Sequence, residues 1–203
     1  MTLSPEVLET MRRAALDSPA TFVTGTLFNG EAYVCNGDAE SYDQLRRELA
    51  TLLSVAQSDV RLIGSAKVGF SLNPDHLLSL FGKESDLDFV IVRSDTFDEA
   101  ALELAARADE FVLAGEDEKR RLRKSKENLF HGFLRPDQLP LTCSLQRDWF
   151  PKLAGPYGHP VARQYPVKAW LFKSLQHATM TYTAHQRRIQ PAVLNILTQR
   201  GDL

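Results

Sequence analysis

Two acidic side chains stand at the head of an apolar run in this sequence. Asp86 and Asp88 are separated by one residue and precede residues 89–92, a run typical of a buried strand. Because alternate residues of a strand face the same side, both carboxylates are expected to point one way. Neighbouring carboxylates repel each other unless a cation lies between them, and their hard oxygens suit Mg²⁺ or Mn²⁺. The pair therefore predicts a metal site.

A glycine-serine turn earlier in the chain supplies the complementary chemistry. Residues 60–63 predict a short strand, Gly64 permits a tight turn, and Ser65 is expected to begin a helical turn whose free amides face an anion. The Ser65 hydroxyl and the Lys67 ammonium add further donors. These residues predict a phosphate-binding turn facing the metal site, which is what transfer of a nucleotide from its triphosphate requires.

Together the two motifs resemble the signature of the polymerase-β-like nucleotidyltransferase superfamily. Either motif alone is common in turns and solvated loops, but two linked motifs in this order, each at a strand end, are more specific. The resemblance covers roughly residues 40–93 and rests on Gly64, Ser65, Lys67, Gly69, Ser71, Ser85, Asp86, Leu87 and Asp88. The long insert between the motifs is more similar to the branch of bacterial oligonucleotide synthases and defence nucleotidyltransferases than to antitoxin-type members.

The resemblance implies a fold and an activity. The fold would be a mixed α/β (α+β) sheet flanked by helices. The activity would be metal-dependent transfer of a nucleoside monophosphate from an NTP or dNTP, such as ATP, to a hydroxyl acceptor with release of pyrophosphate, in anti-phage defence. The acceptor stays open among a nucleotide, an oligonucleotide, a transfer RNA and a protein side chain. Mg²⁺ or Mn²⁺ would lie on Asp86 and Asp88. The candidate phosphate-binding residues are Gly64, Ser65, Lys67, Ser71 and Lys168.

A third carboxylate is also implied, on a neighbouring strand that residues 139–145 are predicted to form. This run contains no acid, although Asp137 precedes it and Asp148 follows it. Asp148 would reach the site only if a bulge bends the strand. Without it, the alternative function is a catalytically weakened nucleotide-binding sensor or subunit that needs a partner. A structural domain that oligomerises without a ligand would leave the Asp86 and Asp88 pair unexplained.

The composition places the chain among ordinary globular proteins. Its 203 residues are 43% hydrophobic and 25% charged, values that fit one domain with a sizeable core. The net charge of −2 provides no overall attraction for nucleic acid. Cys35 and Cys143 are expected to be buried thiols. Because the sequence shows neither a leader pattern nor a long apolar run, we expect a cytoplasmic protein with no membrane contact. A homo-oligomer and a complex with a partner protein are both open.

Patterns elsewhere predict the remaining elements. Helices are expected from Pro5 to about residue 17, from Ser41 through a leucine-rich face, and over residues 96–108. Residues 21–35, with a central Asn-Gly pair, predict a hairpin. The charge run at 116–126 predicts either a solvated helix face or a contact with triphosphate or nucleic acid.

The chain is expected to divide near residue 160. Residues 1–160 would form the nucleotidyltransferase core with an N-terminal helix and hairpin. Residues 161–203 would form a C-terminal helical segment packed on the core, with a long helix beginning at Tyr165. Lys168 would lie outside the apolar face of that helix.

Overall fold

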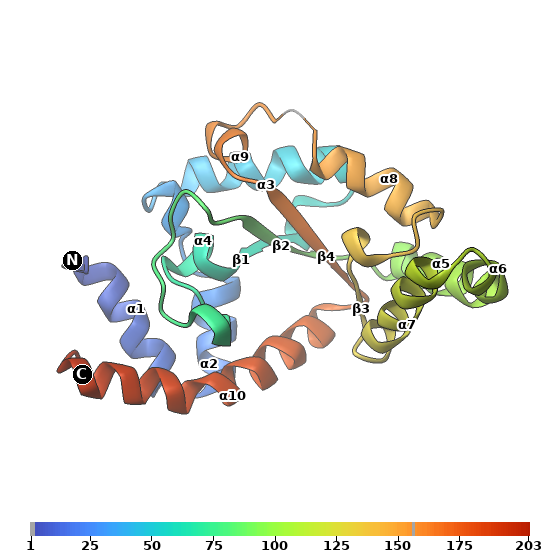
Figure 1. The fold of residues 1–203 in the computed structure, drawn as a ribbon. Helices are drawn as coiled ribbons and strands as arrows, with labels where there is room; N and C mark the ends of the chain where they lie inside the picture. The colour runs from blue at the N-terminus through green and yellow to red at the C-terminus, as the bar shows by residue number, and fades with distance from the viewer. Residues whose placement is uncertain (1–2, 156) are drawn as a thin grey trace.

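A four-stranded mixed sheet forms the centre of the molecule (Figure 1). The computed structural model describes residues 3–155 and 157–203. The strand order is β1-β2-β4-β3, with β1 antiparallel to β2, β2 parallel to β4, and β4 antiparallel to β3. The mixed α/β class predicted from the sequence is confirmed. The strands are β1 (Val60–Ile63), β2 (Leu87–Val92), β3 (Phe133–Leu134) and β4 (Val167–Phe172).

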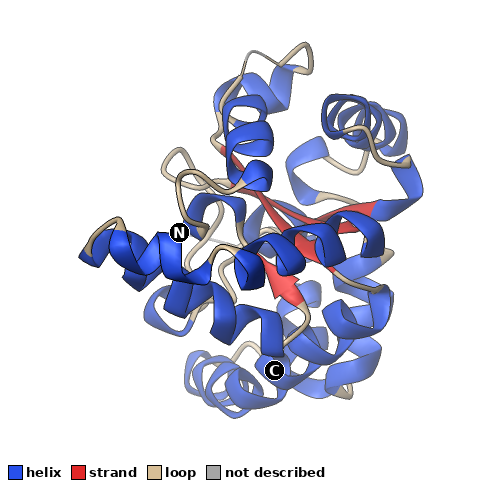
Figure 2. Cartoon of the chain, turned by 90° about the vertical axis from the view of Figure 1, so that its right-hand side faces the viewer, coloured by secondary structure: helices blue, strands red, loops and turns tan. Residues whose placement is uncertain are grey.

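Helices surround the sheet (Figure 2). The first layer contains α3 (Ala39–Leu53), α5 (Ser94–Ala106) and α8 (Ser144–Leu153), and the second contains α1 (Pro5–Leu16) and α10 (Leu175–Arg200). The remaining helices and helical turns are α2 (Pro19–Thr21), η1 (Phe22–Phe28), η2 (Tyr33–Cys35), η3 (Gln57–Asp59), α4 (Gly64–Val68), η4 (Pro74–His76), α6 (Ala108–Leu113), α7 (Glu116–Phe130), η5 (Pro136–Gln138) and α9 (Pro160–Gln164).

The central strand β2 contributes side chains to two hydrophobic clusters, one on each face of the sheet. Leu87, Phe89 and Ile91 pack with α3, α5 and α8, whereas Val90 packs with α1 and α10. Because side chains alternate along a strand, Asp88 shares the α10 side with Val90. The alternation that buries this strand therefore also sets the direction of its acidic side chain.

Three predicted helices are confirmed, two of them with small differences at their starts. In α1 the Ser4 hydroxyl accepts a hydrogen bond from the Val7 amide at 3.3 Å, as the Ser-Pro sequence predicts. The helix predicted from Ser41 begins two residues earlier as α3, because the Asp38 carboxylate accepts a hydrogen bond from the Glu40 amide at 3.0 Å. The predicted helix over 96–108 is α5, which begins at Ser94.

The hairpin predicted over residues 21–35 is wrong. Residues 22–28 form η1, a π-helix, and η2 follows. The Ser18 hydroxyl accepts a hydrogen bond from the Thr21 amide at 3.2 Å and so begins a helix ahead of the β-prone residues. The apolar side chains then pack in the α1 and α10 cluster, where Phe28 contacts the Tyr182 ring at a centroid distance of 5.8 Å. Tertiary packing overrides strand propensity here.

The helix predicted from Tyr165 is also wrong at its start. Residues 167–172 form β4, the partner of β2, and helix α10 begins only at Leu175. The Ser174 hydroxyl caps α10 by accepting a hydrogen bond from the His177 amide at 3.3 Å. The segment 161–203 therefore contributes a strand inside the sheet as well as the long helix.

The strand predicted over residues 139–145 does not form. Leu139 and Cys143 are buried, as they would be in a strand, but Ser144 begins helix α8. The Glu103 carboxylate accepts a hydrogen bond from the Ser144 amide at 2.9 Å and caps that helix. Asp148 lies in α8, where its carboxylate pairs with Lys152 at 2.7 Å. It is thus not a strand residue beside the acidic pair.

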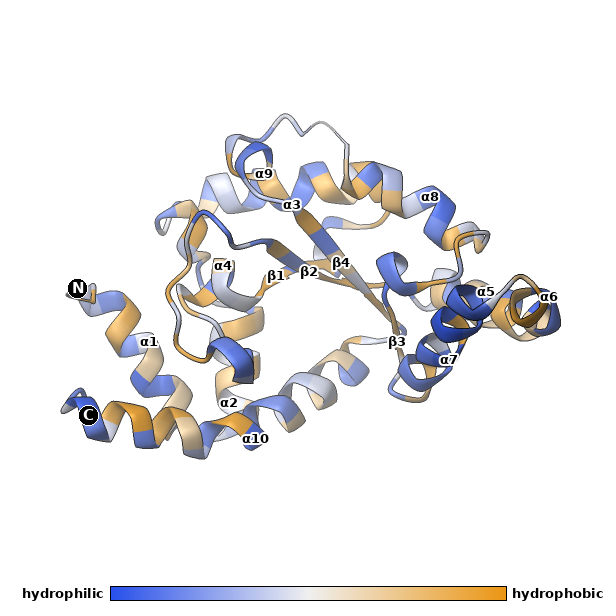
Figure 3. Ribbon diagram, viewed as in Figure 1, coloured by the Kyte–Doolittle hydropathy of each residue, from blue (hydrophilic) through white to orange (hydrophobic). Residues whose placement is uncertain are grey.

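The charge run at 116–126 lies in α7, which Figure 3 shows as hydrophilic along much of its length. Lys119 pairs with Glu116 at 3.3 Å, and Arg120 pairs with Asp117 at 3.0 Å. The Arg121 guanidinium instead donates to backbone carbonyls of the following loop. A solvated helix face is therefore confirmed, and contact with nucleic acid stays a prediction.

The remaining expectations concern the two cysteines and membrane-spanning helices. Cys35 and Cys143 are free and buried thiols, as predicted. Within residues 3–155 and 157–203, no helix combines the length and the apolar character needed to cross a membrane.

Candidate nucleotide site

The glycine-serine turn lies directly beside the acidic pair. Strand β1 pairs antiparallel with β2 so that Ile63 is opposite Asp88, and the chain then turns at Gly64 with a φ of +68°. A Cβ atom on Gly64 would lie 3.4 Å from a carboxylate oxygen of Asp88. Glycine therefore suits this position both for its backbone conformation and for its close approach to the acid. Ser65 follows as the second residue of α4.

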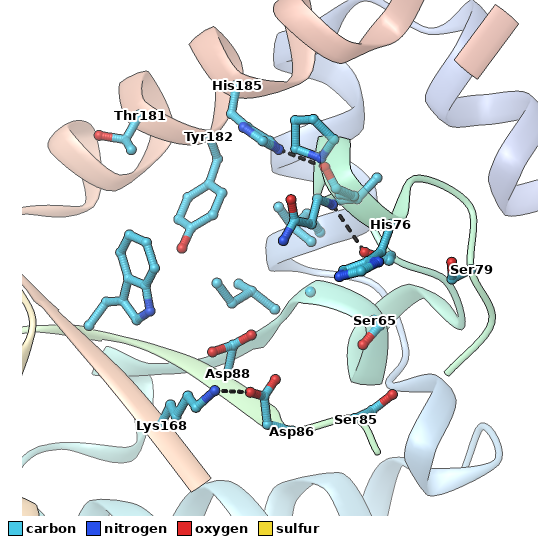
Figure 4. A pocket seen from close by; sticks show the side chains of 18 of the residues that line it. Ser65, His76, Ser79, Ser85, Asp86, Asp88, Lys168, Thr181, Tyr182 and His185 are labelled. Atoms are coloured by element: carbon cyan, nitrogen blue, oxygen red, sulfur yellow. Dashed lines mark hydrogen bonds and ion pairs between the residues drawn. The ribbon is translucent and has the colours of Figure 1, made fainter. Parts of the chain in front are cut away.

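A lysine completes the acidic pair. Asp86 precedes β2 and Asp88 is its second residue, and both line one cavity. On the neighbouring parallel strand β4, Lys168 is opposite Asp88 in the pairing register. Its ammonium donates a hydrogen bond to the Asp86 carboxylate, as Figure 4 shows. The site therefore contains two carboxylates and one internal cation.

Burial changes the acidity of Asp88. Loss of solvent, and next the negative charge of Asp86, raise the pKa of the Asp88 carboxyl to about 7, against the opposing effect of Lys168. The hydrogen bond from Lys168 to Asp86 raises the pKa of the Lys168 ammonium. The lysine therefore stays charged at neutral pH, whereas the Asp88 carboxyl loses its proton only as the pH rises through about 7.

The cavity over this pair has a volume of about 1100 Å³, large enough for a nucleotide. Strands β1, β2 and β4 supply one wall, and helix α10 supplies another. The lining residues used below are Gly64, Ser65, Ser71, His76, Glu84, Asp86, Asp88, His131, Arg135, Lys168, Trp170, Tyr182, His185 and Arg188.

Two buried donors of residues that line the cavity have no partner among the described residues. They are the Trp170 indole nitrogen and the Tyr182 hydroxyl. Figure 4 shows the Tyr182 hydroxyl directed toward Asp88. Because burial raises the pKa of Tyr182, its hydroxyl keeps its proton. Buried donors are normally satisfied, so a ligand or water with acceptor atoms is expected in this part of the cavity.

The insert between the two motifs is tied to α10. The His185 ring nitrogen Nε2 lies 2.9 Å from the Leu72 carbonyl oxygen, and the Arg188 guanidinium lies 3.1 Å from Nδ1 of the same ring. Ser71 and His76 of the insert line the cavity. The insert thus closes the cavity from the side of the glycine-serine turn (Figure 4).

The structure brings six of the seven predicted site residues together. Those that line the cavity are Gly64, Ser65, Ser71, Asp86, Asp88 and Lys168. Lys67 does not line it. Its side chain is only 2% exposed, donates to the Gly30 carbonyl and lies 4.6 Å from the centroid of the Tyr42 ring. Successive helical residues turn by about 100°, so Ser65 and Lys67 of α4 point about 200° apart. The prediction that Lys67 binds phosphate is therefore not supported by its position.

We predict that Lys67→Met leaves nucleotide binding unchanged and stabilises the protein at neutral pH. Burial lowers the pKa of Lys67 to about 8. Folding therefore favours the neutral form of the Lys67 amine. The stability linked to that neutral form is lost as the pH falls through 8. At pH 7 the free energy of unfolding should rise by about 1 kcal/mol or more in the variant. This gain should shrink above pH 9, as measured by urea unfolding.

The matched control is Lys119→Met, an exposed lysine of α7 that is paired with Glu116. It should change stability by no more than about 0.5 kcal/mol at either pH. A tenfold loss of nucleotide affinity confined to Lys67→Met would place that lysine in the site after all.

The third carboxylate implied by the resemblance is not found at the expected place. Strand β4 is the neighbour of β2, and its sequence from Val167 to Phe172 contains no acid. In the described part of the chain, no three His, Cys, Asp or Glu side chains are grouped to hold a metal ion. Asp86 and Asp88 nevertheless provide the one or two carboxylates with which Mg²⁺ is often bound when phosphates and water complete its shell. Their chemistry fits one such ion.

Sequence reasoning missed the basic and aromatic wall of the cavity. Arg135 lies just before η5, and its guanidinium carbon is 4.7 Å from the Trp170 ring centroid. Trp170 belongs to β4 and Tyr182 to α10. No local pattern marks these residues, because the fold brings them together from separate elements.

Comparison of the chain with family models, curated proteins and solved structures gave no match. The family resemblance therefore stays a prediction.

Proposed function

We propose that this chain is a nucleotidyltransferase, which moves a nucleoside monophosphate from an NTP or dNTP to a hydroxyl acceptor with release of pyrophosphate. One observation carries the proposal. The β1-β2 register places Gly64 beside Asp88, and Ser65 and Asp86 line the same large cavity. A hydroxyl-bearing turn facing a carboxylate pair suits a triphosphate with its divalent cation.

The phosphate groups would lie between the turn and the basic wall. The Ser65 hydroxyl can donate to a phosphate oxygen, and Gly64 leaves the backbone open to close approach. On the other side, Lys168 and Arg135 supply positive charge. Phosphates held from both sides would keep the α phosphorus near the carboxylates, which is the positioning that in-line transfer needs.

Asp86 and Asp88 would hold a divalent cation on the triphosphate. When bound, Mg²⁺ or Mn²⁺ neutralises phosphate charge and polarises the phosphoryl oxygens. Asp88 is partly buried, and the Tyr182 hydroxyl is directed toward it. Partial removal from water strengthens the electrostatic contacts that this carboxylate would make with a cation.

A second function is favoured by one specific observation. The residue opposite Asp88 on β4 is Lys168, a cation, and β4 contains no acid, whereas the resemblance implies a further carboxylate on a neighbouring strand. A site with two carboxylates and one lysine suits binding more than rapid transfer. The second candidate is therefore a nucleotide-binding sensor or subunit that uses the same cavity and works with a partner.

The two functions are separated by one assay. The protein would be mixed with each of the eight common ribo- and deoxyribonucleoside triphosphates and Mg²⁺ or Mn²⁺. Pyrophosphate release would be followed, products resolved by mass, and binding recorded by thermal shift. Release with one nucleotide supports the transferase. Stabilisation without release supports the sensor. If no triphosphate causes either pyrophosphate release or thermal stabilisation, both functions are contradicted.

A further inference from the structure

The charges that line the cavity are balanced. The acidic members are Glu84, Asp86 and Asp88, and the lysine and arginine members are Arg135, Lys168 and Arg188. Three histidines add further donors, namely His76, His131 and His185. A cavity that depended wholly on divalent cations to receive a polyanion would be dominated by carboxylates. This one already carries as many basic as acidic side chains.

Lys168 is the cation closest to the acidic pair. Its ammonium bonds to Asp86, and its residue is opposite Asp88 in the β2-β4 register. Its side chain is 45% exposed and lines the cavity. An ammonium has three N–H donors, and within the described part of the chain Asp86 is the one hydrogen-bond partner of Lys168. The remaining donors can reach an anion in the cavity while the bond to Asp86 persists.

Arg135 is held beside Lys168 in a fixed orientation. Its guanidinium pairs with Asp137 at 2.8 Å and stacks over the Trp170 ring. The unpartnered Trp170 indole and Tyr182 hydroxyl face the same cavity. Together these groups give the wall an excess of donors over acceptors. Charged donors and buried N–H or O–H groups are what polyphosphate oxygens require.

We propose that Lys168 stands in for one divalent cation by bridging Asp86 and a phosphate of the ligand, so that the cavity binds a nucleoside triphosphate without added metal. The inference deepens the proposed function, because it concerns the same site and ligand. It separates two properties: binding would tolerate removal of metal, whereas transfer would still require it.

The test measures binding of ATP and of inorganic tripolyphosphate by calorimetry, with Mg²⁺ and with excess EDTA. Wild type should bind both ligands in EDTA within about tenfold of its affinity in Mg²⁺. Lys168→Met should weaken binding in EDTA by roughly 10- to 100-fold, the effect of losing one charge-assisted contact. Lys168→Arg should retain most of that binding, because it keeps a charged donor.

The matched control is Lys173→Met. Lys173 is 44% exposed and pairs with Asp98 at 2.8 Å, but it does not line the cavity. This variant should bind like wild type in both buffers. Thermal unfolding of all variants would show that each is folded.

The outcomes separate this inference from the proposed function. Binding in Mg²⁺ that disappears in EDTA would overturn the inference and leave the proposed function standing, as would equal binding by Lys168→Met and wild type in EDTA. Metal-free binding of tripolyphosphate that requires Lys168, without any binding of ATP, would support the lysine's role and overturn the nucleotide as ligand. No binding of either ligand in either buffer would overturn both.

Discussion

Replacing both Asp86 and Asp88 by asparagine should abolish pyrophosphate release while the protein stays folded. The two carboxylates are the negatively charged groups around which the glycine-serine turn and Lys168 are arranged. Asparagine keeps the size of each side chain but removes the charge that would hold a divalent cation. A loss of turnover of at least about 10²-fold is expected, as for removal of a major electrostatic group in other active sites.

The matched control for the double variant is Asp148→Asn. Asp148 is an acid of similar size that pairs with Lys152 in α8, and it does not line the cavity. Steady-state pyrophosphate release with Mn²⁺ would compare the three proteins. Turnover in the double variant equal to that of wild type would remove the acidic pair from the chemistry, whatever nucleotide is bound.

The second large effect concerns stability. Asp88→Asn should make the ligand-free protein more stable at pH 8, because partial burial raises the pKa of the wild-type carboxyl and makes its ionised form costly. The pKa of Asp88 rises from the ordinary 3.8 to about 7 on folding. The folded state therefore holds its proton more tightly than the unfolded state. The stability linked to that proton is complete below pH 4 and is lost as the pH rises through 7.

The size of this effect follows from the shift in pKa. A difference of about 3 units corresponds to at most about 4 kcal/mol, and the pairing of Lys168 with Asp86 will reduce it. Guanidinium unfolding between pH 5 and pH 8 would measure it. The free energy of unfolding of wild type should fall across this range relative to that of Asp88→Asn. Parallel pH profiles of the free energy of unfolding for the two proteins would show that folding does not raise the pKa of Asp88.

The elements around the acidic pair could be predicted because their signals are local. Apolar runs bounded by polar residues identified β1 and β2, and the Gly64 turn followed from the conformational freedom of glycine. Alternation along β2 predicted that Asp86 and Asp88 share one side, and both line the cavity. These features depend on a few neighbouring residues, so the sequence alone contains them.

The wall opposite the turn could not be predicted, because long-range packing decides it. Residues 165–172 have apolar spacing that fits a helix, yet pairing with β2 makes residues 167–172 a strand. Lys168 was a candidate phosphate-binding residue from the sequence, but its place opposite Asp88 depends on that pairing and becomes visible only in the fold. The direction of Lys67 was missed for a different reason. A helix of five residues turns it away from Ser65.

The most direct test of the nucleotide site is a crystal structure with Mn²⁺ and a triphosphate analogue whose α–β bridge cannot be cleaved. Anomalous scattering locates Mn²⁺ independently of the protein atoms. We predict a manganese peak between Asp86 and Asp88, with the triphosphate extending from Ser65 to Lys168. A nucleotide ordered outside this cavity, or manganese bound away from the two carboxylates, would contradict the proposed site.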